Sequence, residues 1–219
     1  MSRPPYGGDL RGGSPDGPSP REDAPVTYNV DEMVYRRAAA MWAFVVQMQG
    51  DRLDEAASSY NAAVQDQLWL DQREAGTLPA DWASYVENEV GSGLNWATTW
   101  TFGADQYYFL DAVAQLRKCV RALPYDGLPD VPDERMVLLL RNFTEHWEDP
   151  TGWSAVELRR QTPDAQPGRA TYTSKDIWIE GVSTSALVSG AGDVDRALRA
   201  GAAATGNRLP APDERPPGV

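Results

Sequence analysis

The segment RNFTEHWED, residues 141–149, holds the two side chains of this sequence that are best suited to chemistry. His146 is the only histidine in the chain, and histidine is the residue type that gains and loses a proton near neutral pH. Arg141 lies five positions earlier, and a planar guanidinium binds phosphates and carboxylates through paired hydrogen bonds. The chain has 18 arginines, so the spacing alone is weak support and the pair must be weighed in its structural context.

The helix expected around this segment separates its polar side chains from its core side chains. At 100° per residue, Arg141, Asn142 and His146 fall on an arc of about 140°. The same arc holds Glu145 and Leu138. The apolar face lies opposite and is formed by Met136, Leu139, Leu140, Phe143 and Trp147. A leucine in the polar arc suggests that something covers this face, and a second subunit would do so.

Other kinds of site lack the residues that they require. The single cysteine, Cys119, excludes an internal disulfide and a cysteine-based zinc site. One histidine without a thiolate cluster disfavours a transition-metal site. The segment GVSTS at 181–185 does not fit the nucleophile pattern G-x-S-x-G, and the segments GSG and GAGD lack the lysine and spacing of a phosphate-binding loop. We therefore expect neither a metal nor a cofactor.

The segment LLLRNFTEHWED, residues 138–149, resembles the signature helix of the HEPN superfamily. These small all-α domains share a motif of arginine, four to six residues and histidine. Here Arg141 and His146 fit that spacing, and Asn142 supplies the polar residue that commonly follows the arginine. The preceding helix, DQYYFLDAVAQLRKCVRAL, also looks like the family, and the resemblance covers roughly residues 30–150.

This resemblance implies a metal-independent RNA endonuclease of the toxin or phage-defence type. His146 would act as general base or acid on a ribose 2′-hydroxyl, Arg141 would bind the scissile phosphate, and Asn142 would orient both. The resemblance also implies a homodimer in which the motif helices of two subunits face each other across a cleft. Side chains five positions apart point about 140° apart on one helix, so a site shared by two copies would bring them together.

The resemblance further implies an RNA substrate, and an antitoxin or defence-system protein as another partner. Arg117, Lys118 and Arg121, on the preceding helix, are the candidates for RNA contacts. They would offset Glu145 and Glu148, which place negative charge where a phosphate would approach. Family members that pair with a nucleotidyltransferase antitoxin often carry a tyrosine where this chain has Glu148, so that particular pairing is not supported.

The composition indicates a soluble, cytoplasmic protein without membrane or DNA partners. The formal net charge of −12 favours solubility and disfavours binding to DNA regardless of sequence. The N-terminus has no apolar stretch of the signal-peptide type. The longest apolar run, AAAMWAFVV, is about half of the ~20 residues that a spanning helix needs. Cys119 lies in a helical pattern and is expected to be buried.

The chain divides into four parts, and the expected fold is mainly α. Residues 1–26 are rich in proline and glycine and are expected to be disordered, as is the tail 207–219. Residues 27–150 form a HEPN-like helical bundle, and residues 151–206 form a β-hairpin plus a short helix packed on it. The fold class is thus a four- to five-helix bundle with a small C-terminal β-hairpin appendage.

Hydrophobic periodicity gives the expected elements within these parts. Two helices flank Gly50, and a short helix and a turn occupy residues 80–101, where Trp82, Trp96 and Trp100 are expected to serve in packing. Further helices follow at 104–124, from Pro132 to about Glu148, and at 193–206. Alternating apolar and polar residues predict strands in WSAVELRR and KDIWIEGVS, residues 153–160 and 175–183.

Three other interpretations of the Arg141–His146 helix remain open from the sequence. The first is a catalytically inactive HEPN-like interaction or dimerisation module that uses the same face. The second is a binding module that takes a small anionic ligand at Arg141. The third is a solvated helix face with ordinary charges.

Overall fold

The computed structural model describes residues 30–90, 93–123, 127–146, 148–149, 151–166, 169–173, 176–204 and 209. This part of the chain is mostly helical and ends in a small antiparallel sheet and a last helix, which confirms the expected fold class. The expected disordered segments, 1–26 and 207–219, lie outside it except for Leu209. No described helix combines the length and the apolar character needed to cross a membrane. The elements are α1 (Val30–Glu74), α2 (Ala80–Glu89), α3 (Trp96–Arg121), α4 (Glu134–Glu145), α5 (Trp153–Gln161), β1 (Ala170–Tyr172), β2 (Ile177–Ile179), β3 (Val182–Ser183) and α6 (Thr184–Ala204).

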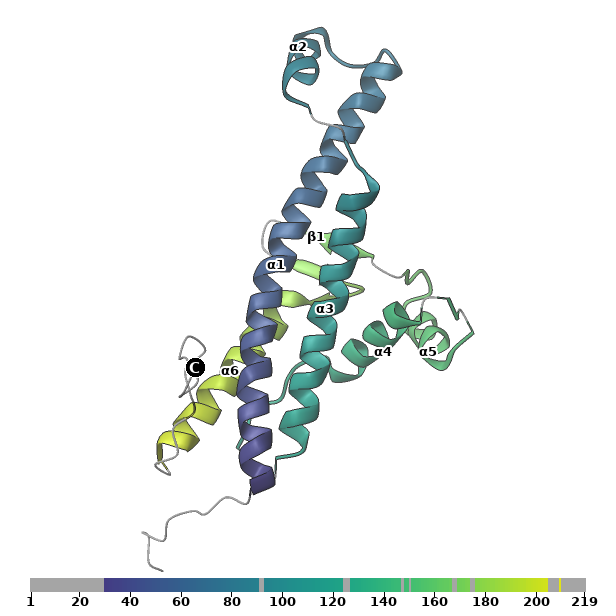
Figure 1. The fold of residues 1–219 in the computed structure, drawn as a ribbon. Helices are drawn as coiled ribbons and strands as arrows, with labels where there is room; N and C mark the ends of the chain where they lie inside the picture. Colours follow the sequence, from purple (N-terminus) through teal and green to yellow (C-terminus); the bar gives the residue numbers. More distant parts are fainter. Residues whose placement is uncertain are drawn as a thin grey trace, which may run out of the picture.

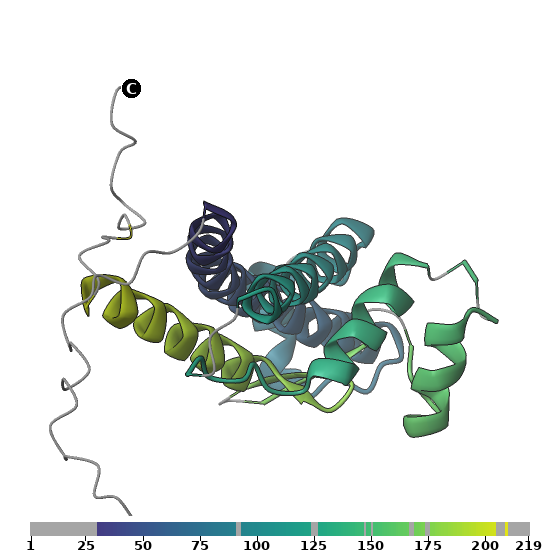
Figure 2. The same ribbon diagram turned by 90° about the horizontal axis from the view of Figure 1, so that it is seen from below.

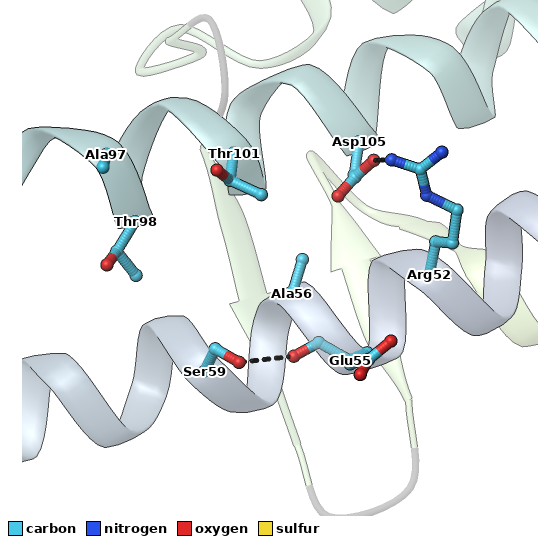
Figure 3. Close-up of a pocket in the computed structure, with 8 residues that line it drawn as sticks. All are labelled: Arg52, Glu55, Ala56, Ser59, Ala97, Thr98, Thr101 and Asp105. Atoms are coloured by element: carbon cyan, nitrogen blue, oxygen red, sulfur yellow. Dashed lines mark hydrogen bonds and ion pairs between the residues drawn. The ribbon is translucent and has the colours of Figure 1, made fainter.

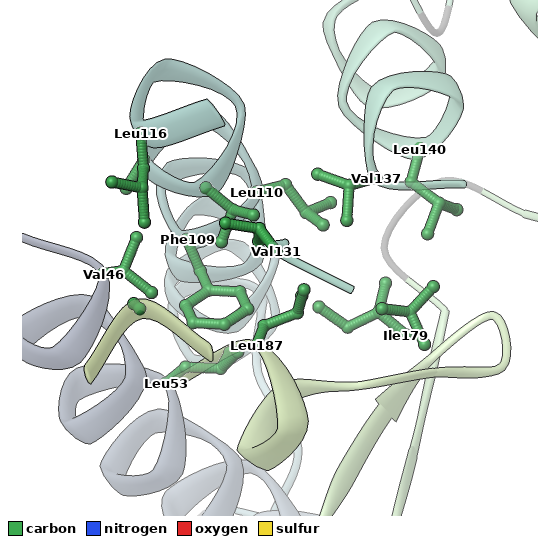
Figure 4. Close-up of a cluster of buried hydrophobic side chains, with 14 of the residues drawn as sticks. Val46, Leu53, Phe109, Leu110, Leu116, Val131, Val137, Leu140, Ile179 and Leu187 are labelled. Atoms are coloured by element: carbon green, nitrogen blue, oxygen red, sulfur yellow. The ribbon is translucent and has the colours of Figure 1, made fainter. Parts of the chain in front are cut away.

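The two longest helices, α1 and α3, lie side by side along most of the molecule (Figure 1). α6 and the sheet lie beside α1, α4 packs against α3, and α5 packs against the far side of α4 (Figure 2). One continuous core joins them (Figure 4). Its largest fully buried side chains include Leu53, Phe109, Leu116, Leu139 and Leu187.

The two helices predicted on either side of Gly50 are one helix of 45 residues, so the predicted break was wrong. Gly50 is buried where α6 crosses α1. A Cβ atom at this position would lie 2.6 Å from Cγ2 of Val188. The glycine therefore permits a close helix contact instead of ending a helix.

The third helix begins earlier than its sequence pattern suggested. Asn95 caps it, because its side-chain oxygen accepts a hydrogen bond from the backbone N–H of Thr98 at 3.0 Å. This start places Trp96 and Trp100 on α3. Trp82 lies on α2, where its ring packs against Trp69.

The segment WSAVELRR is helix α5, not the predicted strand. Over eight residues, its apolar positions fit both the period of a helix and the alternation of a strand. Its buried residues and its side-chain hydrogen bonds are spaced three or four positions apart, as in a helix. Ala155 and Leu158 are both buried, and Glu157 accepts hydrogen bonds from Arg160 and Gln161. These hydrogen bonds, from Arg160 first, hold the pKa of Glu157 down at about 2.

The sheet has the strand order β1-β2-β3, with antiparallel pairs throughout. Glu180 and Gly181, both with positive φ, form the two-residue turn between β2 and β3, as a tight hairpin requires. The last helix was predicted to be short and spans 21 residues. It starts at Thr184 because Asp176 accepts a hydrogen bond from the N–H of Ser185, and Ser183 accepts one from the N–H of Ala186.

A polar contact also ties α1 to α3, beside an open hollow of about 430 Å³ (Figure 3). Arg52 donates a hydrogen bond to Asp105 at 2.9 Å. Asp105 is buried, whereas Arg52 is about half exposed. A buried carboxylate needs such a partner, so this pair fixes the position of the two helices at that level.

Replacing Gly50 with alanine tests the close contact between α1 and α6. Alanine favours a helix by up to about 1 kcal/mol over glycine, but here its methyl group would press on the stiff side chain of Val188. We expect a net loss of about 1–3 kcal/mol in the free energy of unfolding, measured in urea. The matched control is Gly103→Ala on α3, where a Cβ meets nothing within 4 Å, and a gain of about 0.5–1 kcal/mol is expected. Equal effects at both positions would contradict a close contact at Gly50.

Candidate active site

The three predicted catalytic residues lie at the C-terminal end of α4. Arg141 and Asn142 belong to the helix, and His146 directly follows its last residue. The backbone N–H of His146 donates to the carbonyl oxygen of Asn142 at 3.0 Å. The helix was predicted to continue to about Glu148 and ends at Glu145 instead. The core face of α4 is as predicted at Leu139, Leu140 and Phe143, which are buried; Trp147 lies outside the described residues.

The guanidinium of Arg141 is held by three side chains. Its Nε donates to Asp111 of α3 at 3.1 Å, and its Nη1 donates to the side-chain oxygen of Asn142, also at 3.1 Å. Glu145, one turn later on α4, forms a further ion pair with it. The Arg141 side chain is 25% exposed, so the guanidinium is oriented but still open to solvent.

A groove of about 430 Å³ lies between α3 and α4, and it brings together most of the residues singled out from the sequence. The predicted RNA-binding residues Arg117, Lys118 and Arg121 line it from α3. Arg141 and Asn142 line it from α4, and the groove is completed by Ala114, Gln115 and Leu138. Four positive side chains from two helices thus face one hollow, on a chain whose net charge is −12.

Arg117 is the most buried of these cations. Burial, and then the nearby charge of Arg121, lower its pKa to about 10. Since that value lies well above neutrality, Arg117 keeps its charge at physiological pH. A partly desolvated cation attracts an anion more strongly than a fully hydrated one.

His146 lines a separate hollow, of about 290 Å³, between the end of α4 and the start of α5. Its side chain is 65% exposed, with Nε2 at 3.8 Å from Glu145 and Nδ1 at 4.0 Å from Glu148. Asp149 and Trp153 also line this hollow. The imidazole is therefore accessible and lies among carboxylates.

The structure brings Arg141 together with the predicted RNA-binding residues but places His146 in the neighbouring hollow. Asn142 is the residue common to both hollows. Within one chain, Arg141 and His146 thus face different spaces, as their separation of about 140° around a helix predicts.

Of two further residues at this site, Asp111 had not been singled out from the sequence, and Tyr107 had been expected only to serve in helix packing. Asp111 pairs with Arg141 from a position 30 residues earlier. Tyr107, one helical turn before Asp111, has a raised pKa because of burial and then because of the charge of Glu145. The only sequence signal for Asp111 is that it is an isolated acid in the otherwise apolar segment YYFLDAVA. That signal does not show that its partner is Arg141 on another helix.

Two tryptophans that were expected to serve in packing are instead exposed. Trp96 and Trp100 are 78% and 70% exposed on α3, so that prediction was wrong for them. Their exposure follows from the early start of α3, because they lie before the segment of that helix that α4 covers. Cys119 is buried as predicted.

Three aspartates, Asp51, Asp54 and Asp176, line a further hollow, beside the N-terminus of α6. Burial, and then the charges of Asp51 and Asp176, raise the pKa of Asp54. The Asp176 carboxylate is engaged by Ser183 and by the N–H of Ser185. Among the described residues, no group of three or more His, Cys, Asp or Glu side chains is arranged to hold a metal ion.

Comparison with known proteins found no family model, no curated protein and no solved structure that matches this chain.

The contact between Arg141 and Asp111 can be measured by a double-mutant cycle. Arg141→Ala, Asp111→Ala and the double variant should show a coupling of about 0.5–1.5 kcal/mol in the free energy of unfolding, because both side chains are three-quarters buried. The control is the more exposed pair Arg196–Asp193 on α6, with an expected coupling below about 0.5 kcal/mol. A coupling near zero at Arg141 would show that α3 does not orient this guanidinium.

Proposed function

We propose that this protein is a HEPN-like, metal-independent RNA endonuclease of the toxin or phage-defence type. The observation that supports the proposal best is the groove between α3 and α4. It combines the motif residues Arg141 and Asn142 with the cations Arg117, Lys118 and Arg121. Clustered cations are suited to binding the phosphates of RNA, and His146, in the neighbouring hollow, is the residue suited to the proton transfer that cleavage requires.

The reaction we propose uses the RNA's own 2′-hydroxyl as nucleophile. His146 takes the proton of that hydroxyl, whose oxygen then attacks the adjacent phosphorus. The bond from phosphorus to the 5′-oxygen breaks, and the departing oxygen takes up a proton. The products are a 2′,3′-cyclic phosphate and a 5′-hydroxyl end, and DNA is not a substrate because it lacks the attacking group.

Arg141 would stabilise the negative charge that develops on the phosphate. Its present partners, Asp111 and Glu145, hold the guanidinium fork at the edge of the groove, and the phosphate would bind to the exposed part. A homodimer with facing α4 helices would supply His146 from the second copy. The exposed Leu138 in the groove favours such a contact, since it is the apolar residue on this face of α4.

Expression of the wild type and of His146→Ala in a test host is the direct experiment. The wild type should degrade cellular RNA and slow growth, and the loss of the proton-transferring group should reduce cleavage about 100-fold to 10,000-fold. Addition of a chelator to the purified protein should leave cleavage unchanged. Intact folding of the variant is checked by circular dichroism, since the imidazole is exposed.

Matched arginine variants separate the motif from general charge effects. Arg141→Ala should abolish cleavage, whereas Arg160→Ala should not, because Arg160 lies on α5 and pairs with Glu157 outside the groove. Equal growth and intact RNA with the wild type and with His146→Ala would exclude the nuclease. Cleavage that a chelator abolishes would exclude the proposed mechanism.

A second candidate function is a catalytically inactive interaction module. The observation that favours it is that Asp111 and Glu145 already engage Arg141, while Glu145 and Glu148 lie beside His146. In that case the same face of α4 would bind a second subunit or another protein. Retained self-association by His146→Ala, together with no RNA loss in any variant, would be its signature.

The groove also predicts how RNA binding depends on salt. Neutralising Lys118 and Arg121 together should weaken binding of single-stranded RNA and lower the salt dependence of log K by about 0.7 for each phosphate that the variant no longer binds. Fluorescence anisotropy at several salt concentrations measures this, in the His146→Ala background to prevent cleavage. Arg196→Ala, on α6, serves as the control. An unchanged slope of log K against log salt concentration would exclude the groove as the RNA-binding site.

A further inference from the structure

The N-terminal half of α1 carries an exposed apolar seam that the described parts of the chain do not cover. Val34, Met41, Phe44 and Met48 are 58%, 52%, 42% and 40% exposed. In Figure 2, α6 and α3 flank α1, and no described element lies over its outer face. Large apolar side chains gathered on one exposed face are typical of an interaction surface.

The seam has the spacing of a coiled-coil interface. Val34, Met41, Met48 and Glu55 lie seven residues apart, and Arg37, Phe44 and Asp51 form a second series with the same step. The two series alternate by three and four positions, which is the pattern that keeps one stripe of a helix against a partner helix. Neither series belongs to the buried face of α1, which includes Ala39, Ala43, Val46, Leu53 and Ala57.

The charges at the two ends of the seam indicate what covers it. Arg37 lies between Val34 and Met41, near the N-terminal end of the seam, and Asp51 and Glu55 follow its last apolar residue, all exposed. Neighbouring Arg52 turns towards α3 and pairs with Asp105, and the exposed Glu55 lines the rim of the same hollow (Figure 3). Along the seam, the positive Arg37 therefore precedes Met41, Phe44 and Met48, and the negative Asp51 and Glu55 follow them.

We propose that this seam binds a second copy of the same chain, with the two α1 helices antiparallel. A surface that runs from positive through apolar to negative is complementary to itself only when the second copy is reversed. A two-fold axis near position 46 would set Phe44 beside Met48 of the second copy and Arg37 beside Glu55 of the second copy. A parallel pair would place like charges together, which is unfavourable.

This interface is distinct from the one expected at α4, and it does not depend on the proposed nuclease. The described contacts of α4 are mainly with α3 and α5, and the seam lies on the outer face of α1. A pair formed through α1 leaves the groove between α3 and α4 open in each copy. The two contacts can therefore be separated by mutation.

Sedimentation of the full chain tests the seam. The wild type should show a mass at least twice the 24.0 kDa of one chain, and Phe44→Glu should lower that mass by half. With Leu138→Glu added, which removes the contact expected at α4, the mass should fall to that of a single chain. Since Phe44 is exposed in the monomer, the variant should keep its helical content. The matched control is Val156→Glu, which changes an exposed apolar residue of α5 and should leave the mass unchanged.

Charge exchange tests the antiparallel arrangement and uses variants that keep every apolar side chain of the seam. Arg37→Glu and Glu55→Arg should each raise the dissociation constant at least about 5-fold, and the double variant should recover most of that loss. A double variant weaker than both single ones would exclude antiparallel pairing.

A monomer at tens of micromolar, or a dimer that Leu138→Glu disrupts and Phe44→Glu does not, would overturn the proposal. Total-RNA cleavage measured on the same variants keeps the two proposals apart. Phe44→Glu bears on the seam alone, whereas His146→Ala bears on the nuclease and should leave the mass unchanged.

Discussion

The packing of α1 against α3 is the constraint on which the rest of the structure depends. Leu53 and Phe109 lie fully buried between these helices (Figure 4), and the ion pair of Arg52 with Asp105 fixes them at one level. This pair positions α6, which crosses α1 at Gly50, and α4, which lies against α3; α5 in turn packs on α4, and β2 packs on α6. The faces that α1 and α3 do not turn towards each other remain available for other contacts. The groove lies on such a face of α3, beside α4, and the seam lies on such a face of α1.

The candidate site shows how such a scaffold can concentrate positive charge on an acidic chain. The groove draws Arg117, Lys118 and Arg121 from α3 and Arg141 from α4, so two helices supply what neither offers alone. Asp111 and Glu145 orient Arg141 while they partly neutralise it. In the function we propose, a phosphate would have to bind to a guanidinium that two carboxylates already hold, and the outcome of this competition would separate an active enzyme from an interaction module.

Sequence reasoning predicted the features that local periodicity determines. The apolar face of α4 and the shared arc of Arg141 and Asn142 follow from 3.6 residues per turn. The segment KDIWIEGVS was predicted as one strand, and the turn at Glu180–Gly181 divides it into β2 and β3. Sequence reasoning missed features that depend on distant partners. Gly50 lies within a helix, where it makes room for Val188, a residue more than 100 positions later in the chain. Likewise, no local pattern links Asp111 to Arg141. The segment that forms α5 is too short for the spacing of its apolar residues to distinguish a helix from a strand.

The chemistry of the cleaved ends tests the central claim most directly. RNA incubated with the purified protein in the presence of chelator should give fragments with 5′-hydroxyl and 2′,3′-cyclic phosphate ends, and the same oligonucleotide with 2′-deoxyribose throughout should remain intact. These ends follow only if the 2′-hydroxyl is the nucleophile. Fragments with 5′-phosphate ends, or cleavage of the deoxy substrate, would contradict the proposed mechanism.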